Sequence, residues 1–263
     1  MEPIVELLAY TPEPERLVAV ASRRSYDKRS AMQIWEDMTD AEVTELLNRV
    51  IRHGHTSVLE HINFTFAIEG VSRALSHQLV RHRIASYSQQ SQQRSDESDF
   101  TFTVPPEIRK NAKLAKEFQE KMNALAEFYA KAIQHRISKG QARYVLPNAC
   151  VTRIVMTMNA RSLFNLISQR TCGVEDWEFR TVASKIHQTL LEIAPNIFRH
   201  AGPRCVVDLV CLEGKRGEKC GLYKNIPGAV LRDGFDITTD GRLIESTQIY
   251  TGKRMYSRET SEV

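Results

Sequence analysis

The stretch I62-N-F-T-F-A-I68 decides which kind of fold this chain adopts. Apolar residues alternate in it with small or polar ones, and a period of two is typical of a strand with one buried face. Gly70 separates this strand from a basic segment that begins as a helix. The same order recurs further along, where residues 152–158 suit a strand and residues 160–170 a helix. The sequence therefore predicts a mixed fold of helices and strands.

The sequence before the first strand predicts two helices. Pro12 and Pro14 lead into a helix that runs through residues 17–22. Thr39 followed by Glu42 is typical of a capping box, in which each side chain binds a free backbone N–H group of the other residue. The helix that begins there continues through evenly spaced apolar residues and ends at Gly54. Those residues are Val43, Leu46, Leu47 and Val50.

Several elements are predicted after the first strand. Residues 86–93 are polar and without apolar periodicity, which favours a loop, and residues 100–104 suit a short strand stopped by two prolines. Residues 107–139 are predicted to form one long helix that ends at Gly140, and residues 176–193 to form another. From Gly202 the sequence becomes rich in glycine and charge. We therefore expect two parts, a first domain of residues 1–202 and a C-terminal extension of residues 203–263.

Two segments carry several arginines and contain no Asp, Glu or Lys. They cover residues 71–94 and 141–170, in a chain that is 26% charged with a net charge of only +4. The arginine fork binds phosphate and carboxylate through paired hydrogen bonds and stays charged when it is partly desolvated. We therefore expect anionic ligands at these segments. Their arginines are Arg73, Arg81, Arg83, Arg94, Arg143, Arg153, Arg161 and Arg170.

Composition excludes several classes of protein. The 263 residues are 42% hydrophobic, which is enough for a core, and no run approaches the roughly 20 apolar residues of a membrane span. The N-terminus lacks the pattern of a signal peptide, so a cytoplasmic location is expected. Five irregularly spaced cysteines suit a reducing compartment rather than a disulfide framework. The net charge is small for a dedicated nucleic-acid binder.

Helical spacing separates two of the arginines. Arg161 and Asn165 are four residues apart and share a face, whereas Arg161 and Arg170 are nine apart, which places them on opposite faces of one helix. Such a helix suggests two adjacent ligands or a site shared between subunits. The alternative for a single arginine is that it reaches solvent around an apolar stripe.

The stretch R81-H-R-I-A-S-Y-S-Q-Q-S91 resembles the signature of the flavin-dependent thymidylate synthases. That signature is Arg-His-Arg, seven residues and Ser, followed shortly by Arg. Further resemblance extends over about residues 4 to 200, with the matching blocks in the family's order and spacing. They are H55-T-S-V-L-E-H61, F64-T-F66, Q141-A-R-Y-V-L-P147, N159-A-R-S-L-F-N165, Arg170 and W177-E-F-R180.

The resemblance implies a fold and an activity. The fold would be α+β, with an antiparallel sheet flanked by helices and a long central helix, assembled as a homotetramer with active sites shared between subunits. The activity would be conversion of deoxyuridylate (dUMP) to thymidylate (dTMP), with methylenetetrahydrofolate as carbon donor, bound FAD and NADPH as reductant. No G-x-G-x-x-G motif follows a strand, so FAD would be held by side chains on a scaffold other than a Rossmann domain.

The resemblance also assigns roles to residues. Arg170 would be catalytic, by stabilising negative charge that develops on the uracil ring. The residues implied for FAD are Ser57, Arg81, His82, Arg83, Gln89, Asn159, Arg161 and Asn165. Those implied for dUMP are Gln78, Arg81, Gln89, Gln90, Ser91, Gln92, Arg94, Arg143 and Arg170.

The signature departs from the family in one place. Members usually show Ser, one residue and then Arg, but here the order is Ser91-Gln92-Gln93-Arg94, which is one residue longer. Either Gln93 takes the position of the arginine, or the loop bulges so that Arg94 reaches it. The bulge is favoured, because a phosphate gains more from a charged, two-pronged partner than from an amide.

Other interpretations compete with these. The arginine segments could track a nucleic-acid backbone, with Tyr87 stacking on bases. His200, Cys205, Cys211 and Cys220 could form a zinc site, but the spacing lacks Cys-x-x-Cys and no metal is predicted. His55 could be a capping residue or, by the resemblance, a neighbour of folate or flavin. No cysteine occupies a motif position, so Cys150 and Cys172 are expected to be structural.

Overall fold

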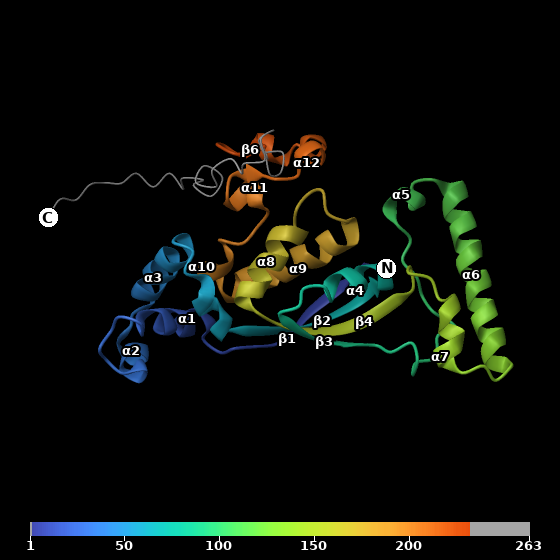
Figure 1. Ribbon diagram of the computed structural model, residues 1–263, viewed down its shortest axis with the longest axis horizontal. Helices are drawn as coiled ribbons and strands as arrows, with labels where there is room; N and C mark the ends of the chain where they lie inside the picture. The colour runs from blue at the N-terminus through green and yellow to red at the C-terminus, as the bar shows by residue number, and fades with distance from the viewer. Residues whose placement is uncertain (1, 232–263) are drawn as a thin grey trace, which may run out of the picture.

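Four antiparallel strands form the main sheet, in the order β1-β2-β4-β3. The computed structural model describes residues 2–231, and Figure 1 shows the sheet running through the lower middle of the molecule. Helices make up most of the remaining chain, so the predicted α+β class is confirmed. The strands are β1 (Ile4–Tyr10), β2 (Asn63–Ser72), β3 (Ala85–Gln89) and β4 (Val151–Asn159).

The central pair β2 and β4 carries the alternation that the sequence predicted. Phe64, Phe66 and Ile68 are completely buried, while the residues between them are partly exposed. Across the ladder Phe64 pairs with Met158 and Phe66 with Met156, so both strands turn the same face inward. The strand is longer than predicted. The register shifts between Glu69 and Val71, Gly70 has a φ of 70°, and pairing continues to Ser72, which is typical of a bulge.

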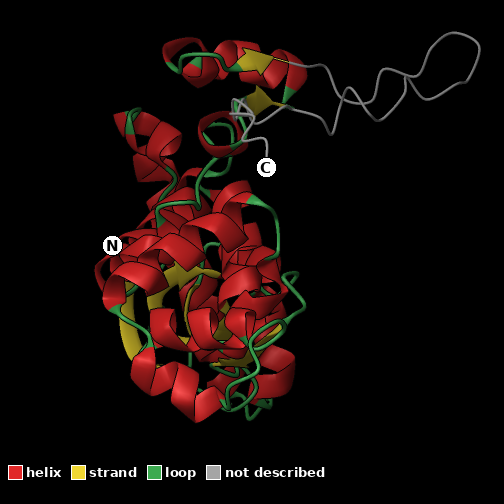
Figure 2. Ribbon diagram, turned by 90° about the vertical axis from the view of Figure 1, so that its left-hand side faces the viewer, coloured by secondary structure: helices red, strands yellow, loops and turns green. Residues whose placement is uncertain are grey.

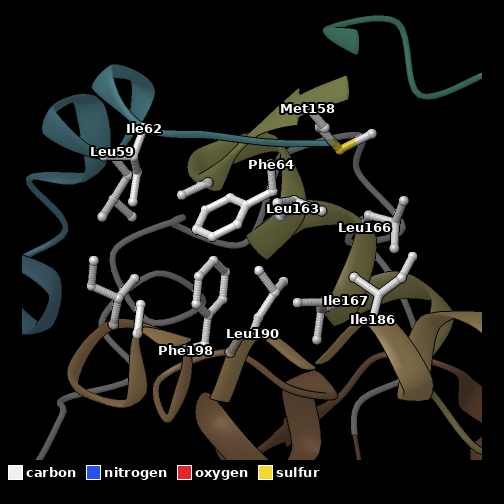
Figure 3. Close-up of a cluster of buried hydrophobic side chains, with 14 of the residues drawn as sticks. Leu59, Ile62, Phe64, Met158, Leu163, Leu166, Ile167, Ile186, Leu190 and Phe198 are labelled. Atoms are coloured by element: carbon white, nitrogen blue, oxygen red, sulfur yellow. The ribbon is translucent and has the colours of Figure 1, made fainter. Parts of the chain in front are cut away.

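Helices cover the buried face of the sheet. Helices α8 (Ala160–Arg170) and α9 (Trp177–Ile193) lie over it together with α4 (Arg73–Leu79) in Figure 1, and Figure 2 shows the strands lying among helices. On the opposite face Thr65 and Thr157 share a hydrogen bond of 2.9 Å and Val155 is 37% exposed. The core is therefore one layer between helices and sheet. Its side chains in Figure 3 include Leu59, Ile62, Phe64, Met158, Leu163, Leu166, Ile167, Ile186, Leu190 and Phe198.

The two predicted N-terminal helices form, and a further short helix that was not predicted lies between them. Helix α1 (Pro14–Arg23) is followed by α2 (Ala31–Asp37) and α3 (Asp40–Arg52). Both halves of the Thr39–Glu42 capping box are present, and α2 begins with a second box that the prediction missed. Gly54, with a φ of 77°, follows the end of α3 as expected and leads into the 3₁₀ helix η1 (Thr56–His61).

The long helix is interrupted and lies at one edge of the molecule. It consists of α5 (Pro106–Arg109), α6 (Ala112–Gln134) and α7 (Lys139–Ala142), followed by the 3₁₀ helix η2 (Arg143–Val145). Asn111 ends the first turn because its side chain caps α6, and Gly140 lies inside α7 rather than at a helix end. Figure 1 places α6 at the right-hand edge, so the prediction of a long central helix is wrong in position. The helix buries only Met122 and Tyr129.

Two predictions of local structure are wrong. The polar segment 86–93 contains β3, whose residues Ala85–Gln89 pair with β4 at the edge of the sheet, with Tyr87 and Gln89 turned inward. An edge strand needs few apolar residues, so the polar composition concealed it. Residues 100–104 do not form a strand, since a single bridge joins Phe102 to Cys150.

The described part of the extension forms a small unit of its own beside α8 and α9. After α10 (Pro195–Phe198), helix α11 (Arg204–Val207) and helix α12 (Gly214–Cys220) alternate with two short strands and a 3₁₀ helix. The strands pair in parallel and are separate from the main sheet. The predicted polar tail lies outside the described residues. These remaining elements are β5 (Val210–Cys211), η3 (Leu222–Asn225) and β6 (Val230–Leu231).

Candidate active site

Arg170, at the C-terminal end of α8, is the centre of the candidate site. Its Nη1 donates to Glu175 Oε2 at 2.6 Å and lies 3.5 Å from Gln78 Oε1, while its Nε donates to His82 Nε2 at 3.2 Å. Its Cζ lies 4.6 Å from the centroid of the Phe179 ring, a cation–π contact. The side chain is 20% exposed. Three predicted residues, Gln78, His82 and Arg170, are therefore in direct contact.

His82 is neutral in this arrangement. Because arginine has no acceptor, the hydrogen bond from Arg170 requires an unprotonated Nε2, with the ring proton on Nδ1. Burial and the positive charge of Arg170 lower the pKa of His82 to about 4. The ring also stands edge-on to Phe179, with centroids 5.9 Å apart. The signature histidine is thus an acceptor for the guanidinium at neutral pH.

Tyr87 fixes the turn that carries the signature. Its hydroxyl lies 2.9 Å from both Leu79 O and His82 O, so β3 holds the turn between α4 and the signature by one side chain. Burial raises the pKa of Tyr87 to about 12. A tyrosine engaged in this way is a structural support, which counts against the idea that Tyr87 stacks on nucleic-acid bases.

The arginines of the two acid-free segments divide into two groups. Four of them contact either a side chain outside the two segments or a backbone carbonyl. For example, Arg153 lies 3.6 Å from Glu69, and Arg73 donates to Gln90 O at 3.3 Å. The other four form no side-chain hydrogen bond or ion pair with any residue between 2 and 231. They are Arg81, Arg83, Arg94 and Arg143, all in motif positions. Four cationic side chains without an anionic partner are the expected lining of an anion site.

The N-terminal end of α8 presents a second group of predicted residues. Arg161 forms an ion pair with Glu60 of η1, the short helix that also carries the exposed Ser57. Arg161 and Arg170 therefore contact different elements, as their spacing predicted. Asn159 accepts from Ser162 N at 2.8 Å and caps α8, and Asn165 accepts from Gln169 at 3.0 Å. Each asparagine keeps amide N–H groups for other partners.

His55 begins η1 and contributes no side-chain cap. Its exposed ring stacks on His53, with centroids 6.3 Å apart.

Gln89 and Gln90 are engaged within the protein. The Gln89 amide donates to Ser76 Oγ at 2.9 Å and to Thr152 Oγ1 at 3.2 Å, which joins β3 to α4 and β4. Gln90 Oε1 accepts from Arg153 Nη1 at 3.1 Å, and its backbone N–H donates to Arg153 O at 3.0 Å. These contacts place both glutamines beside the arginines but use much of their hydrogen-bonding capacity.

The serine-glutamine loop closes into a turn at the position of the extra residue. The N–H groups of Arg94 and Ser95 both donate to Ser91 O, at 3.0 and 2.9 Å. Gln92 lies against Cys150, with Nε2 to Sγ at 3.6 Å, while Gln93 and Arg94 are exposed. A Cβ at Gly140 would lie 3.4 Å from Gln93 Cγ, so the Gln93 side chain packs beside α7.

The hollows of this structure described below lie away from the candidate site. A hollow of about 450 Å³ lies between β1 and α9, lined by residues such as Glu2 and Lys185, and a second of about 360 Å³ lies along β1. Neither contains a predicted site residue. Among the predicted site residues, Arg81, Arg83 and Arg94 are exposed in the single chain.

Sequence reasoning assigned no role to three residues of the site. Phe179 supports the Arg170 guanidinium, and Glu175 is its ion-pair partner. Glu178 is buried and accepts from Ser72 N at 2.8 Å and from Ser72 Oγ at 2.5 Å, which ties α9 to the start of α4. Burial raises the pKa of Glu178. The block W177-E-F-R180 was the available signal, since both Glu178 and Phe179 lie in it.

The cysteines, possible metal ligands and membrane-spanning helices of residues 2–231 are described next. All five cysteines are free thiols, and burial raises the pKa of Cys150 to about 11. Among residues 2–231 no three His, Cys, Asp or Glu side chains are grouped so as to hold a metal ion. Within the same range, every helix is too short or too polar to cross a bilayer.

Comparison with known proteins identifies the family. The profile of a family described as "Thymidylate synthase complementing protein" matches residues 6–196. A flavin-dependent thymidylate synthase of Clostridium tetani is 43% identical over 218 residues, which is 77% of this chain and 88% of that protein. The enzyme of the same name from Geobacter sulfurreducens is 43% identical, over 82% of this chain and 93% of its own.

A third relative gives the same result. The flavin-dependent thymidylate synthase of Sulfurisphaera tokodaii is 42% identical over 207 residues, covering 77% of this chain and 79% of that one. The profile includes the signature, both arginine segments and Arg170, so the residues that meet in the structure all lie inside the matched region. Family profile, relatives and the meeting of Arg170 with His82 agree that this chain belongs to the flavin-dependent thymidylate synthases.

Proposed function

We propose that the protein converts dUMP to dTMP in de novo thymidylate synthesis, with methylenetetrahydrofolate as carbon donor, bound FAD as cofactor and NADPH as reductant. The observations that carry the proposal are the contact of Arg170 with His82 and the four arginines that have no protein partner among the described residues, of which Arg81 and Arg83 flank His82 in the sequence and the others are Arg94 and Arg143. FAD and dUMP both bear phosphates, which are the anions that arginine forks bind best.

The residues proposed for FAD fit an anionic cofactor. Arg81 and Arg83 are exposed and unpaired within residues 2–231, and Asn159, Arg161 and Asn165 follow one end of α8 near Ser57. When FAD binds, the Arg161 guanidinium would either leave Glu60 and bind the cofactor, or bind both groups at once. His82 would contact the flavin while it accepts from Arg170. Bound FAD supplies the redox chemistry, and the side chains named here bind and orient it.

The residues proposed for dUMP lie on the signature turn, the polar loop and α8. Arg81, Arg94 and Arg143 would bind the phosphate. Gln89, Gln90, Ser91 and Gln92 would assist them. The turn that closes from Ser91 to Ser95 supports the bulged arrangement, in which Arg94 is the charged partner and Gln93 packs aside. Gln78 and Arg170 would meet the base. Gln89 would act mainly by joining β3 to α4, given its two internal contacts.

Arg170 is proposed to stabilise negative charge on the uracil ring. Its guanidinium has fixed partners at Nε and Nη1 and rests on Phe179, so little reorganisation is needed when charge develops. A cysteine nucleophile is not needed in this scheme. Cys150 is completely buried with a pKa of about 11, so it is a thiol rather than a thiolate at neutral pH.

Assembly and organisation follow from the same proposal. A homotetramer with shared active sites suits the exposed Arg81, Arg83 and Arg94, the sheet face on which Val155 is 37% exposed, and α6, which leaves Phe128 59% exposed. The catalytic domain would be residues 1–202, with residues 203–263 as an extension, and the enzyme would act in the cytoplasm on small molecules rather than on nucleic acid or membranes.

Anaerobic reduction of the flavin tests the proposal. The purified protein should be yellow, and NADPH should bleach its flavin absorbance faster when dUMP is present. The full mixture with methylenetetrahydrofolate should then release dTMP. A colourless protein that retains nucleic acid, or a flavin that NADPH does not bleach with or without dUMP, would contradict the assignment.

A further inference from the structure

The turn between α8 and α9, residues 171–176, carries the acidic partner of Arg170. Both carboxylate oxygens of Glu175 are engaged, since Oε2 accepts from Arg170 Nη1 at 2.6 Å and Oε1 accepts from Asp176 N at 2.9 Å. The Glu175 side chain is only 18% exposed. A carboxylate held by a backbone N–H group cannot follow the arginine freely, so it fixes the position of Nη1.

Glu175 therefore completes a frame around the guanidinium. His82 fixes Nε, Glu175 fixes Nη1, and Phe179 supports the face. No hydrogen bond within residues 2–231 uses Nη2, which leaves that nitrogen for a ligand. Three fixed contacts determine the plane and direction of a planar group, and a displacement of about 1 Å at a reacting group can lower a rate about a hundredfold.

The same turn is held from the other side by two further arginines. Arg180 of α9 donates from Nη1 to Gly173 O at 2.8 Å, and Arg216 of α12 donates from Nη2 to Val174 O at 2.8 Å. The extension also packs closely here, because a Cβ at Gly173 would lie 2.5 Å from Cys220 Sγ. The path from the extension to Arg170 is therefore short and continuous.

We propose that Glu175 is a positioning residue for Arg170, and that α12 of the extension braces the turn that carries it. This inference rests on the proposed role of Arg170 in thymidylate formation. The family profile ends at residue 196, so the brace comes from a part of the chain beyond that profile. The extension thus takes part in shaping the site although none of its described residues contacts Arg170.

Glu175→Gln is the first test. Glutamine replaces one of the two accepting oxygens with an NH2 group, so a donor would face either Asp176 N or Arg170 Nη1 and one of the two fixed contacts is lost. We expect kcat to fall at least about tenfold, whereas KM for dUMP stays equal or decreases because a negative charge near the anion is removed. Glu218→Gln on the exposed side of α12 is the matched control and should behave as wild type.

Arg216 tests the brace. Arg216→Ala should lower kcat about threefold and increase hydrogen exchange in the peptide that spans residues 171–176, because one backbone carbonyl loses its partner. Arg216→Lys should restore both, since the contact uses a single donor. Arg204→Ala, an exposed arginine on α11 with no side-chain partner among residues 2–231, is the control.

Each result separates this inference from the proposed function. If wild type with FAD, NADPH, methylenetetrahydrofolate and dUMP makes no dTMP, the proposed function is wrong. If wild type is active and folded Glu175→Gln keeps its kcat, the positioning role is wrong. If Glu175→Gln does not fold, the Arg216 variants decide the question alone, and unchanged exchange and kcat in Arg216→Ala would overturn the brace.

Discussion

Replacement of Arg170 by lysine separates the geometry of this residue from its charge. Lysine keeps the positive charge, and its ammonium can reach one of the oxygens that now surround Nη1. It cannot also donate to His82 Nε2 from a position 3.2 Å away in the same plane, and it has no planar face for Phe179. The change therefore removes orientation while it leaves the charge in place.

The size of the effect follows from the contacts that are lost. A hydrogen bond from a charged donor contributes roughly 1.5–3 kcal/mol, and a partly desolvated cation–π contact about 1 kcal/mol. The side chain is 20% exposed, so the lower part of this range applies. A loss of about 3 kcal/mol in the transition state corresponds to about a hundredfold lower turnover. FAD affinity should change less than about threefold, because most residues proposed for FAD lie elsewhere.

Two measurements check this prediction. Single-turnover formation of dTMP gives the rate, and fluorescence titration of the apoprotein with FAD gives the affinity. Arg199→Lys is the control, since Arg199 is an exposed arginine with one contact, Nη2 to Asn48 Oδ1 at 2.8 Å. Equal losses of turnover and of FAD binding in Arg170→Lys would refute a role on the substrate side.

The remaining predictions concern the cysteines, the polar loop and pH. Joint replacement of Cys150 and Cys172 by alanine should leave dTMP formation largely intact; loss of several orders of magnitude in a folded variant would reopen a covalent route. In calorimetric titrations with dUMP, Arg94→Ala should weaken binding at least about tenfold, while Gln93→Ala should be mild and deletion of Gln93 tolerated; the reverse pattern would refute the bulge. The folded state holds the pKa of His82 at about 4, below its usual value of 6.5, so the unfolded chain takes up the proton first. The melting temperature of the ligand-free protein should therefore fall from pH 7 to pH 5 more steeply than that of His82→Gln, and parallel slopes would contradict this.

Local signals in the sequence predicted much of the fold. The Thr39–Glu42 capping box, the alternation of residues 62–68 and the apolar spacing in α8 are all short-range patterns, and each element is present. One failure came where a distant partner decides the structure, because residues 85–89 become a strand only where β4 offers its edge. The other came from a local signal that was overlooked, because the Asn111 side chain accepts from Leu114 N and begins a new helix there.

The sequence indicated candidate site residues but did not predict which of them contact one another. The motif positions identified Gln78, His82 and Arg170, which meet in the structure. The sequence did not predict Glu175 as the ion-pair partner of Arg170, because Glu175 lies in a turn without a periodic pattern. Gln89 shows the opposite case, because a polar residue in a motif can serve a neighbouring helix and strand as well as a ligand.

Helix α8 sets limits on how the length of this chain can vary. Arg161 and Arg170 are nine positions apart, which at 1.5 Å per residue is a span of about 13.5 Å. One inserted residue would rotate Arg170 by about 100° away from His82 and Phe179, so insertions and deletions between these arginines should be eliminated by selection. The turn at Ser91–Ser95 has no helical register to keep, and it is there that the resemblance predicts one extra residue in this chain.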